Sequence, residues 1–271
     1  MLHRHWHGTD VPALGLGTWE LRGDACAAAV DRALALGYRH LDTAQGYDNE
    51  RQVGEGLRRS GVPRDEVFLT TKVRPRHFRH DDLLRSTEAS LAALGVDAVD
   101  LLLLHWPNRD VPLDETLGAL HEARARGLTR HVGVSNFNAA LTRRAVAAGP
   151  TLTNQVEYHP FLAQTKLLAL ADELGLLLTA YSPVARGLVR QDPTLREIGE
   201  RHGKSPGQVA LRWLLQQPRV VAIPKAASPE NQAANLDVFD FALDDEEMRR
   251  VFALARAERL VDDPSVDWDE G

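Results

Sequence analysis

Six glycines divide most of the chain into segments of similar length. Each follows a helical pattern and precedes a β-rich run, as in ALALGYRHLD, AALGVDAVDLLLLH and ELGLLLTAYS. A glycine in this place fits the left-handed conformation that ends a helix. The spacing of about 22 to 34 residues is the length of one strand plus one helix, so the sequence predicts repeated βα units with a parallel sheet. The glycines are Gly37, Gly61, Gly95, Gly127, Gly149 and Gly175.

The number of predicted strands indicates a closed barrel. Counting GLGTW at 15–19 as the first strand and VVAIP at 220–224 as the last gives eight strands with helices between them. This pattern predicts an α/β fold, a (β/α)8 TIM barrel. Because no linker rich in Pro, Gly or Ser interrupts it, we expect one domain over residues 1–271. The preceding segment LHRHWHGTDVPAL alternates about a GTD turn, which predicts a β-hairpin over the N-terminal end of the barrel.

An open doubly wound sheet is the alternative α/β fold. It would carry a glycine-rich phosphate-binding fingerprint after its first strand. GLGTWE at 15–20 begins like this fingerprint but has Glu20 in place of the third glycine, and the sequence contains no GxxxxGK[ST] motif. The barrel is therefore favoured.

Composition and charge exclude several functional classes. A content of 44% hydrophobic residues is typical of soluble globular proteins, and the net charge of −6 indicates no basic surface for nucleic acid. No run approaches the roughly 20 apolar residues that span a membrane, and the N-terminus lacks an apolar signal-peptide region. The single cysteine, Cys26, cannot form an intrachain disulfide, and its small-residue neighbours predict a packing role. We expect a cytoplasmic protein, and nothing in the sequence demands more than a monomer.

Polar side chains follow several predicted strands directly. His105 ends the run LLLLH, Lys72 follows VFLTT, and Asp42 follows YRHL with Tyr47 five residues later. In a (β/α)8 barrel the carboxyl ends of the strands gather the active site. The sequence therefore predicts that Asp42, Tyr47, Lys72 and His105 face one barrel mouth. Singly, each has a structural alternative: an ion pair, a surface aromatic or a core histidine.

These residue types suit proton transfer to an oxygen. A tyrosine is a weak acid at neutral pH, but an adjacent lysine ammonium favours its anion, and an aspartate keeps that lysine charged. A neutral imidazole can donate a hydrogen bond to the same substrate oxygen. A metal site is not expected, since the set has one histidine and one carboxylate, and the histidines of HRHWH lie in the predicted hairpin.

The chain resembles the aldo-keto reductases over nearly its whole length. The motifs are LDTAQGYDNE, LTTKV, LLLLHWP, GVSNFN, NQVEYHP, AYSPVARG and IPKAAS, in that order. The short loops and the ending RLVDDPSVDWD are most similar to the prokaryotic branch that includes 2,5-diketo-gluconate and methylglyoxal reductases. The resemblance implies a (β/α)8 barrel that binds a nicotinamide cofactor without a Rossmann domain. It also implies Tyr47 as general acid, Lys72 and Asp42 as groups that tune its pKa, and His105 as the residue that orients the carbonyl.

The resemblance also implies a set of binding residues. Ser135, Asn136 and Gln155 match positions that hydrogen-bond the nicotinamide carboxamide, and Tyr181 matches the aromatic that stacks on the nicotinamide ring. Ser182, Leu188 and Lys225 match positions along the pyrophosphate and the adenosine phosphate, and Asn235 completes the cofactor set. Trp19 and Trp106, with Tyr47 and His105, are expected to line a small aromatic substrate pocket.

One departure from the family pattern concerns the cofactor. After Lys225 the family usually has Ser or Thr, and an arginine six residues beyond the lysine binds the 2′-phosphate; here these positions are Ala226 and Asn231. Lysine supplies a charge without the guanidinium fork. We expect NADPH as cofactor, with weakened discrimination against NADH.

The function expected from these features is NADPH-dependent reduction of small aldehydes, ketoaldehydes or keto sugars, such as methylglyoxal or 2,5-diketo-D-gluconate. One alternative is a noncatalytic barrel that binds nicotinamide as a sensor or partner subunit. The intact set of Asp42, Tyr47, Lys72 and His105 weighs against it. The other alternative is a hydrolase or isomerase of phosphorylated substrates, which would be fully active without nicotinamide.

Overall fold

A parallel sheet of eight strands forms the centre of the computed structural model, which describes residues 2–263 and 266–268. Each strand pairs with the strands before and after it in the chain. The prediction of a (β/α)8 barrel is confirmed. The strands are β3 (Leu16–Gly17), β4 (His40–Asp42), β5 (Phe68–Val73), β6 (Val99–Leu104), β7 (Thr129–Ser135), β8 (Thr153–Glu157), β9 (Leu177–Tyr181) and β10 (Val220–Ala222).

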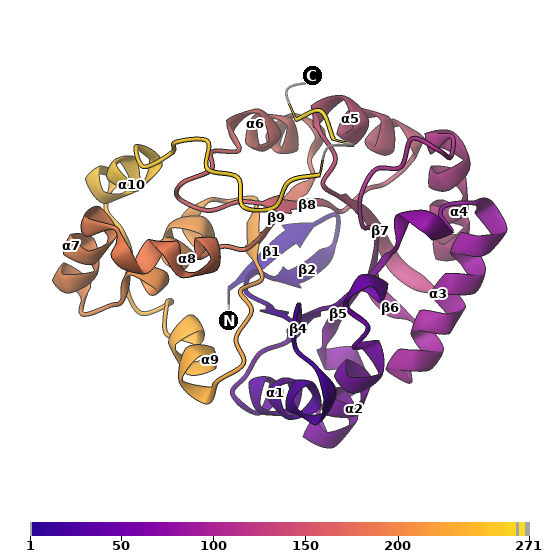
Figure 1. Cartoon of the computed structure of the whole chain (residues 1–271), viewed down its shortest axis with the longest axis horizontal. Coiled ribbons are helices and arrows are strands. Elements are labelled where there is room, and N and C mark those ends of the chain that lie inside the picture. Colours follow the sequence, from indigo (N-terminus) through magenta and orange to yellow (C-terminus); the bar gives the residue numbers. More distant parts are fainter. Residues whose placement is uncertain (1, 264–265, 269–271) are drawn as a thin grey trace.

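Parallel bridges between the first and last strands close the sheet. Leu14 pairs with Ala222, and Gly17 pairs with Lys225. The backbone N–H of Gly15 donates to the carbonyl of Ala222 at 2.9 Å. The barrel therefore has no free edge along these residues, and its helices form an outer ring around it (Figure 1).

The helices follow the strands in alternation, with four short 3₁₀ turns among the connections of the described chain. Ser205 with Gln208, and Asp244 with Glu247, form capping boxes that fix the starts of two helices. The α-helices are α1 (Gly23–Ala35), α2 (Glu50–Ser60), α3 (His80–Leu94), α4 (Leu113–Ala125), α5 (Ala139–Ala148), α6 (Thr165–Leu174), α7 (Pro193–His202), α8 (Pro206–Gln216), α9 (Pro229–Leu236) and α10 (Asp245–Phe252). The 3₁₀ turns are η1 (Gln45–Tyr47), η2 (Arg64–Glu66), η3 (Pro75–His77) and η4 (Ala185–Gln191).

The glycines behind the fold prediction have the expected conformation with one exception. Gly37, Gly61, Gly95, Gly127 and Gly175 have positive φ between 66° and 105°. The expectation is wrong for Gly149, whose φ of 160° and ψ of 178° are extended. This position takes a glycine because there is no space for a side chain: a Cβ there would lie 2.6 Å from Cε1 of His121, on α4.

The predicted hairpin is present, but its turn lies earlier than expected. Strands β1 (His3–Trp6) and β2 (Thr9–Pro12) pair antiparallel, with Trp6 opposite Thr9. The connection is therefore His7–Gly8, and Thr9 and Asp10 belong to β2. Both His7 and Gly8 have positive φ, as a two-residue hairpin turn of matching twist requires.

The hairpin covers the N-terminal end of the barrel, as expected, and lies behind the centre of the ring in Figure 1. The guanidinium of Arg4 donates to the carbonyls of Val220, Leu215 and Gln217 at 2.5 to 2.9 Å. Trp6 belongs to an apolar cluster with Phe68 and Leu177, the first residues of β5 and β9. The hairpin is therefore part of the core, at the end of the barrel opposite the strands' carboxyl termini.

Two further expectations from the sequence concern the single cysteine and membrane-spanning helices. Cys26 is fully buried in α1, and burial raises the pKa of its thiol to about 11, so the side chain is a packing group. No helix in residues 2–263 or 266–268 is long and apolar enough to span a membrane.

Candidate active site

The four side chains expected at the barrel mouth come from three neighbouring strands. Asp42 is the last residue of β4, Lys72 lies near the end of β5, and His105 directly follows β6. Tyr47 ends η1, the 3₁₀ turn between β4 and α2. Because β4, β5 and β6 are adjacent and parallel, their carboxyl ends bring these groups together at one rim.

Asp42 and Lys72 form a fully buried ion pair. Nζ of Lys72 lies 2.5 Å from Oδ1 of Asp42, and the two side chains are 0% and 2% exposed. The same ammonium donates to the carbonyl of Thr43 at 2.9 Å and to the hydroxyl of Tyr47 at 3.2 Å. Oδ2 of Asp42 accepts a hydrogen bond from Nε2 of Gln155 at 2.8 Å. The three ammonium protons therefore have three partners, and one of them is the phenol.

The pKa directions differ within this group. Burial by itself would lower the pKa of Lys72, but the charge of Asp42 and the hydrogen bonds to Asp42 and Tyr47 raise it overall, so the lysine is an ammonium. Burial raises the pKa of Tyr47, and the lowering effect of Lys72 is smaller. The lysine favours the anion, as expected from the sequence, but desolvation of the phenolate is larger and the pKa of Tyr47 is raised overall. The phenol keeps its proton at neutral pH.

His105 is a neutral imidazole beside the phenol. Burial, with the charges of Lys72 and Arg74, lowers the pKa of His105 to about 3. Its ring centroid lies 5.6 Å from that of Tyr47, with the planes at 76°. Its backbone is fixed on both sides, since its N–H donates to Val73 at 3.1 Å and its carbonyl accepts from Nδ2 of Asn136 at 3.0 Å.

Four of the expected cofactor residues form a connected group next to the ion pair. The hydroxyl of Tyr181 donates to Oδ1 of Asn136 at 2.8 Å, and Nδ2 of Asn136 lies 3.1 Å from Oγ of Ser135. Oγ of Ser135 donates to the carbonyl of Gln155 at 2.9 Å. Gln155 in turn donates to Asp42, a link between the two groups that the sequence did not indicate.

The other expected cofactor residues lie on the connections that follow β9 and β10. Ser182 follows β9 with a positive φ of 49°, and Leu188 lies in η4, partly buried against the core. Lys225 is an exposed residue after β10. Asn235 lies on α9, one turn after Gln232, whose carbonyl accepts from the hydroxyl of Tyr38 at 3.0 Å.

Aromatic side chains rim the mouth from separate segments. Trp19 follows β3, is 40% exposed and stacks with the guanidinium of Arg186 at 4.9 Å. Trp106 lies edge-on to Trp268, with ring centroids 6.3 Å apart. Arg259 stacks on the other ring of that pair, Trp268, at 3.8 Å. Trp268 could not be predicted as part of the site, because no local sequence pattern indicates that the C-terminal segment returns to the barrel.

A buried carboxylate anchors this C-terminal segment, which Figure 1 shows in yellow, returning past α6 toward α5. Glu157, the last residue of β8, is 0% exposed. Its oxygens accept from the backbone N–H groups of Leu260 and Val261, each at 2.9 Å, and lie 2.9 Å from Nε2 of His159. The segment therefore has a fixed path toward Trp106.

No group of three or more His, Cys, Asp or Glu in the described ranges could hold a metal ion.

The sequence matches the aldo/keto reductase family over residues 13–256. The chain belongs to this family. This aldo-keto reductase is 41% identical over 275 residues to morphine 6-dehydrogenase of Pseudomonas putida, covering 95% of this chain and 92% of that protein. It is 40% identical over 266 residues to methylglyoxal reductase DkgB of Escherichia coli O157:H7, covering 96% and 99%. A solved structure named 2,5-diketo-D-gluconic acid reductase B matches it with 48% identity and a TM-score of 0.97, covering 100% and 98%.

The family membership establishes the class of reaction. These similarities support an NAD(P)H-dependent oxidoreductase. An aldo-keto reductase of Bombyx mori, 35% identical with a TM-score of 0.88 over 94% of this chain and 92% of that one, is solved in complex with NADP. This aldo-keto reductase therefore uses a nicotinamide cofactor, and the chemistry of the group at Ser135, Asn136 and Tyr181 fits one: an amide and a hydroxyl can pair with a carboxamide beside a flat aromatic ring.

Proposed function

We propose that this aldo-keto reductase reduces the carbonyl of small aldehydes, ketoaldehydes or keto sugars, such as methylglyoxal or 2,5-diketo-D-gluconate, with NADPH and with Tyr47 as general acid. The observation that carries the proposal is the phenol itself. Its hydroxyl is 3.2 Å from the Lys72 ammonium and its ring is 5.6 Å from the neutral imidazole of His105. The similarity to a methylglyoxal reductase and to a 2,5-diketo-D-gluconic acid reductase supports the substrate class.

The chemistry divides among the four residues as follows. A bound reduced nicotinamide supplies a hydride to the carbonyl carbon. Tyr47 donates its proton to the carbonyl oxygen as negative charge develops there. Neutral His105 donates a hydrogen bond to the same oxygen and so orients the substrate.

Lys72 and Asp42 act on the state that follows proton transfer. The phenolate that remains on Tyr47 is disfavoured by burial, and the Lys72 ammonium at 3.2 Å offsets this cost. Asp42 holds the ammonium charged and in place at 2.5 Å. Lys72 therefore lowers the cost of giving up the proton without removing that proton at neutral pH, and Asp42, whose own charge raises the pKa of Tyr47, contributes by holding the ammonium.

The cofactor would be held along the C-terminal ends of β7 to β10. We propose that Ser135, Asn136 and Gln155 bind the carboxamide and that Tyr181 stacks on the ring. Ser182, Leu188, Lys225 and Asn235 would contact the pyrophosphate and adenosine parts. Trp19 and Trp106 would wall the substrate, and the exposure of Trp19 supports this.

Preference between the two nicotinamide cofactors is expected to be modest. Ala226 is buried and offers no hydroxyl, and Asn231 is an exposed amide. Glu230 adds a negative charge in the first turn of α9. We propose that NADPH is favoured through Lys225 and that NADH is also used; a preference for NADPH of several hundredfold would contradict this.

We also propose that the chain acts as a cytoplasmic monomer with one catalytic domain over residues 1–271. Size-exclusion chromatography with light scattering would test the monomeric state, and a mass of two chains would contradict it.

Initial rates of NADPH and NADH oxidation with methylglyoxal test the function. Tyr47→Phe removes the proton donor and little else, so we expect normal cofactor affinity and loss of most of kcat. Tyr158→Phe is the matched control, because it removes a phenol that bonds Gln217 inside the core. A Tyr47→Phe variant with half the wild-type kcat would refute the acid role. Cofactor binding without turnover by wild type on any carbonyl tested would favour the noncatalytic nicotinamide-binding alternative.

A further inference from the structure

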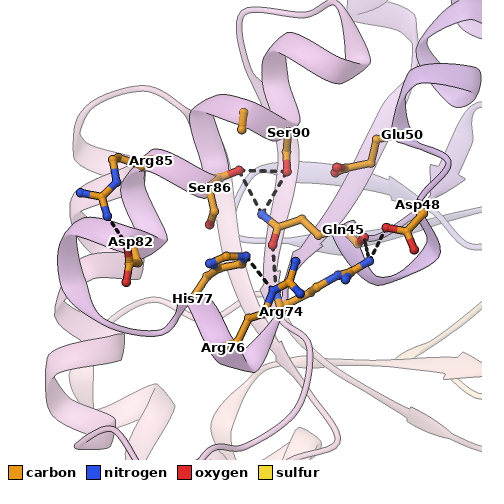
Figure 2. A pocket seen from close by; sticks show the side chains of 11 residues that line it. Gln45, Asp48, Glu50, Arg74, Arg76, His77, Asp82, Arg85, Ser86 and Ser90 are labelled. Atoms are coloured by element: carbon orange, nitrogen blue, oxygen red, sulfur yellow. Dashed lines mark hydrogen bonds and ion pairs between the residues drawn. The ribbon is translucent and has the colours of Figure 1, made fainter.

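The turn that carries Tyr47 is held from its outer side by a set of polar contacts (Figure 2). The guanidinium of Arg74 donates to the carbonyl of Gln45 at 2.6 Å and forms an ion pair with the carboxylate of Asp48. Gln45 precedes Tyr47 by two residues and Asp48 follows it directly. One side chain therefore holds the chain on both sides of the phenol.

The side chain of Gln45 joins this turn to two other elements. Its Oε1 accepts from the backbone N–H of Arg74 at 3.0 Å, just after β5. Its Nε2 donates to the carbonyl of Ser86 and to Oγ of Ser90, each at 3.0 Å, on α3. We call Arg74, Gln45, Ser86 and Ser90 the outer support.

The turn itself has few backbone hydrogen bonds, although its flank is tied down where Asn49 accepts from Thr43 at 2.7 Å and donates to the carbonyl of Thr18 at 2.8 Å. η1 is a single 3₁₀ turn, and its internal hydrogen bonds are that of Tyr47 to Ala44 at 3.0 Å and a long one of Asp48 to Gln45 at 3.4 Å. Asp48 has a φ of 54°, a left-handed conformation that is costly for a residue with a side chain. Arg22 also donates to the carbonyl of Tyr47, but through an exposed contact.

We propose that Arg74 and Gln45 are positioning residues that hold the hydroxyl of Tyr47 over the Lys72 ammonium. Arg74 leaves the same strand end as Lys72, two residues later, so β5 fixes both the charge below the phenol and the turn that carries it. The inference rests on Tyr47 as the proton donor. A misplacement of about 1 Å in a reacting group can cost about 100-fold in rate, so the effect should appear in kcat.

The structure supplies a control within the same pocket. The outer support borders a cavity of about 390 Å³ that Arg76 and Arg85 also line. Arg76 hydrogen-bonds Nε2 of His77 at 3.0 Å, and Arg85 pairs with Asp82. Arg76→Ala removes a similar charge from that pocket while leaving the contacts to the turn in place.

Loss of charge must be separated from loss of position. The charge of Arg74 also helps to lower the pKa of His105, so Arg74→Ala alters both. Gln45→Ala changes no charge and removes the ties to α3 and to the Arg74 backbone. If position is the cause, both variants lower kcat, and Gln45→Ala does so with an unchanged pH profile.

The test is reduction of methylglyoxal, measured as steady-state kcat and as the single-turnover rate constant by stopped flow, with cofactor Kd measured by fluorescence titration. We expect kcat to fall about 10- to 100-fold in Arg74→Ala and Gln45→Ala, with cofactor Kd within twofold of wild type and Arg76→Ala unaffected. In a Tyr47→Phe background, either change should cost less than twofold more, because the group being positioned is absent.

Two results would overturn the inference: kcat within twofold of wild type in Gln45→Ala, or losses that multiply in the Tyr47→Phe background. If Arg74→Ala does not fold, Gln45→Ala decides alone. A full rate in Tyr47→Phe would remove the proposed acid and this inference with it. Loss of rate in Tyr47→Phe with normal rates in both support variants would remove the outer support only.

Discussion

Replacing Asp42 with asparagine tests whether the buried ion pair sustains both stability and activity. The substitution keeps the shape of the side chain but only one of its two accepting oxygens, which in the wild type bond Lys72 and Gln155, and it removes the charge 2.5 Å from Nζ of Lys72. The lysine side chain is 0% exposed, so water cannot replace the lost partner without movement of the structure.

The expected cost follows from the balance of attraction and desolvation. At 2.5 Å and an effective dielectric constant of about 20, the attraction between the charges is about 7 kcal/mol. Burial of each ion costs several kcal/mol, which cancels most of this gain. Removing one partner leaves the other buried and unpaired, and this costs about 3 to 5 kcal/mol. We therefore expect Asp42→Asn to lower the free energy of unfolding by that amount at pH 7.

The pH dependence has a defined sign. In the wild type the folded-state pKa of Lys72 lies above its ordinary value of 10.5, so its stabilising contribution is present below pH 10.5 and is lost as the pH rises through the folded pKa. In Asp42→Asn the charge of Asp42 no longer opposes burial, and only Tyr47 still raises the pKa of Lys72, so we expect burial, the largest effect, to bring that pKa below 10.5. The difference in stability between wild type and variant should therefore be largest near neutrality and shrink toward pH 10.

Urea denaturation of three variants would measure this. Asp42→Asn should lose about 3 to 5 kcal/mol, and the double variant Asp42→Asn/Lys72→Met should lose less, because no unpaired charge stays buried. Asp114→Asn is the surface control: its pair with Arg144 joins side chains 87% and 53% exposed, so less than about 1 kcal/mol is expected. A loss below about 1 kcal/mol in Asp42→Asn, or a double variant less stable than the single one, would refute the reasoning.

Four further predictions concern other parts of the site. Because the pKa of His105 is about 3, kcat/KM should show no histidine titration from pH 5 to 8, and a step near pH 6.5 that His105→Gln abolishes would contradict this. The same depressed pKa means that His105 lowers stability progressively as the pH falls below 6.5, a loss that His105→Gln should reduce in urea titrations at pH 4.5. Glu157→Gln should cost about 1 to 3 kcal/mol and speed hydrogen exchange in residues 256–263, since one buried N–H loses its acceptor; unchanged exchange would argue against the anchor. Asn231→Arg should raise the NADPH to NADH ratio of kcat/KM about tenfold or more, since a charge-assisted hydrogen bond contributes about 1.5 to 3 kcal/mol, and an unchanged ratio would place the 2′-phosphate elsewhere.

The barrel could be predicted from the sequence because its signals are local. A helix end, a left-handed glycine and a β-rich run lie within about ten residues of one another, and this unit recurs. Gly149 breaks the rule because its backbone is extended, and the feature that excludes a side chain there is the ring of His121, on another helix. The hairpin turn was misplaced by about one residue because a GTD sequence and an HG sequence both allow positive φ, and pairing of Trp6 with Thr9 selects the second.

The sequence could predict only those residues of the candidate site whose positions are determined by the ends of strands. Asp42, Lys72 and His105 are each fixed by where a strand stops. The hydrogen bond from Gln155 to Asp42 joins residues 113 apart in the chain, and no sequence pattern within β8 indicates it. The sequence indicated the effect of Lys72 on the phenol of Tyr47 but not the size of the opposing desolvation, because that depends on how the folded chain buries the ring.

The parts of the site differ in how firmly the barrel holds them. Asp42 and Lys72 lie within strands, so their separation is fixed by the pairing of β4 with β5. Trp19, Trp106 and Trp268 lie on three separate segments outside the strands, and the last is fixed through the carboxylate of Glu157. Substitutions in these segments can therefore reshape the substrate pocket without moving the ion pair. Tyr47 reacts beside the residues that the strands fix, but it lies on a turn outside the strands. Its position therefore depends on contacts such as those of Arg74 and Gln45.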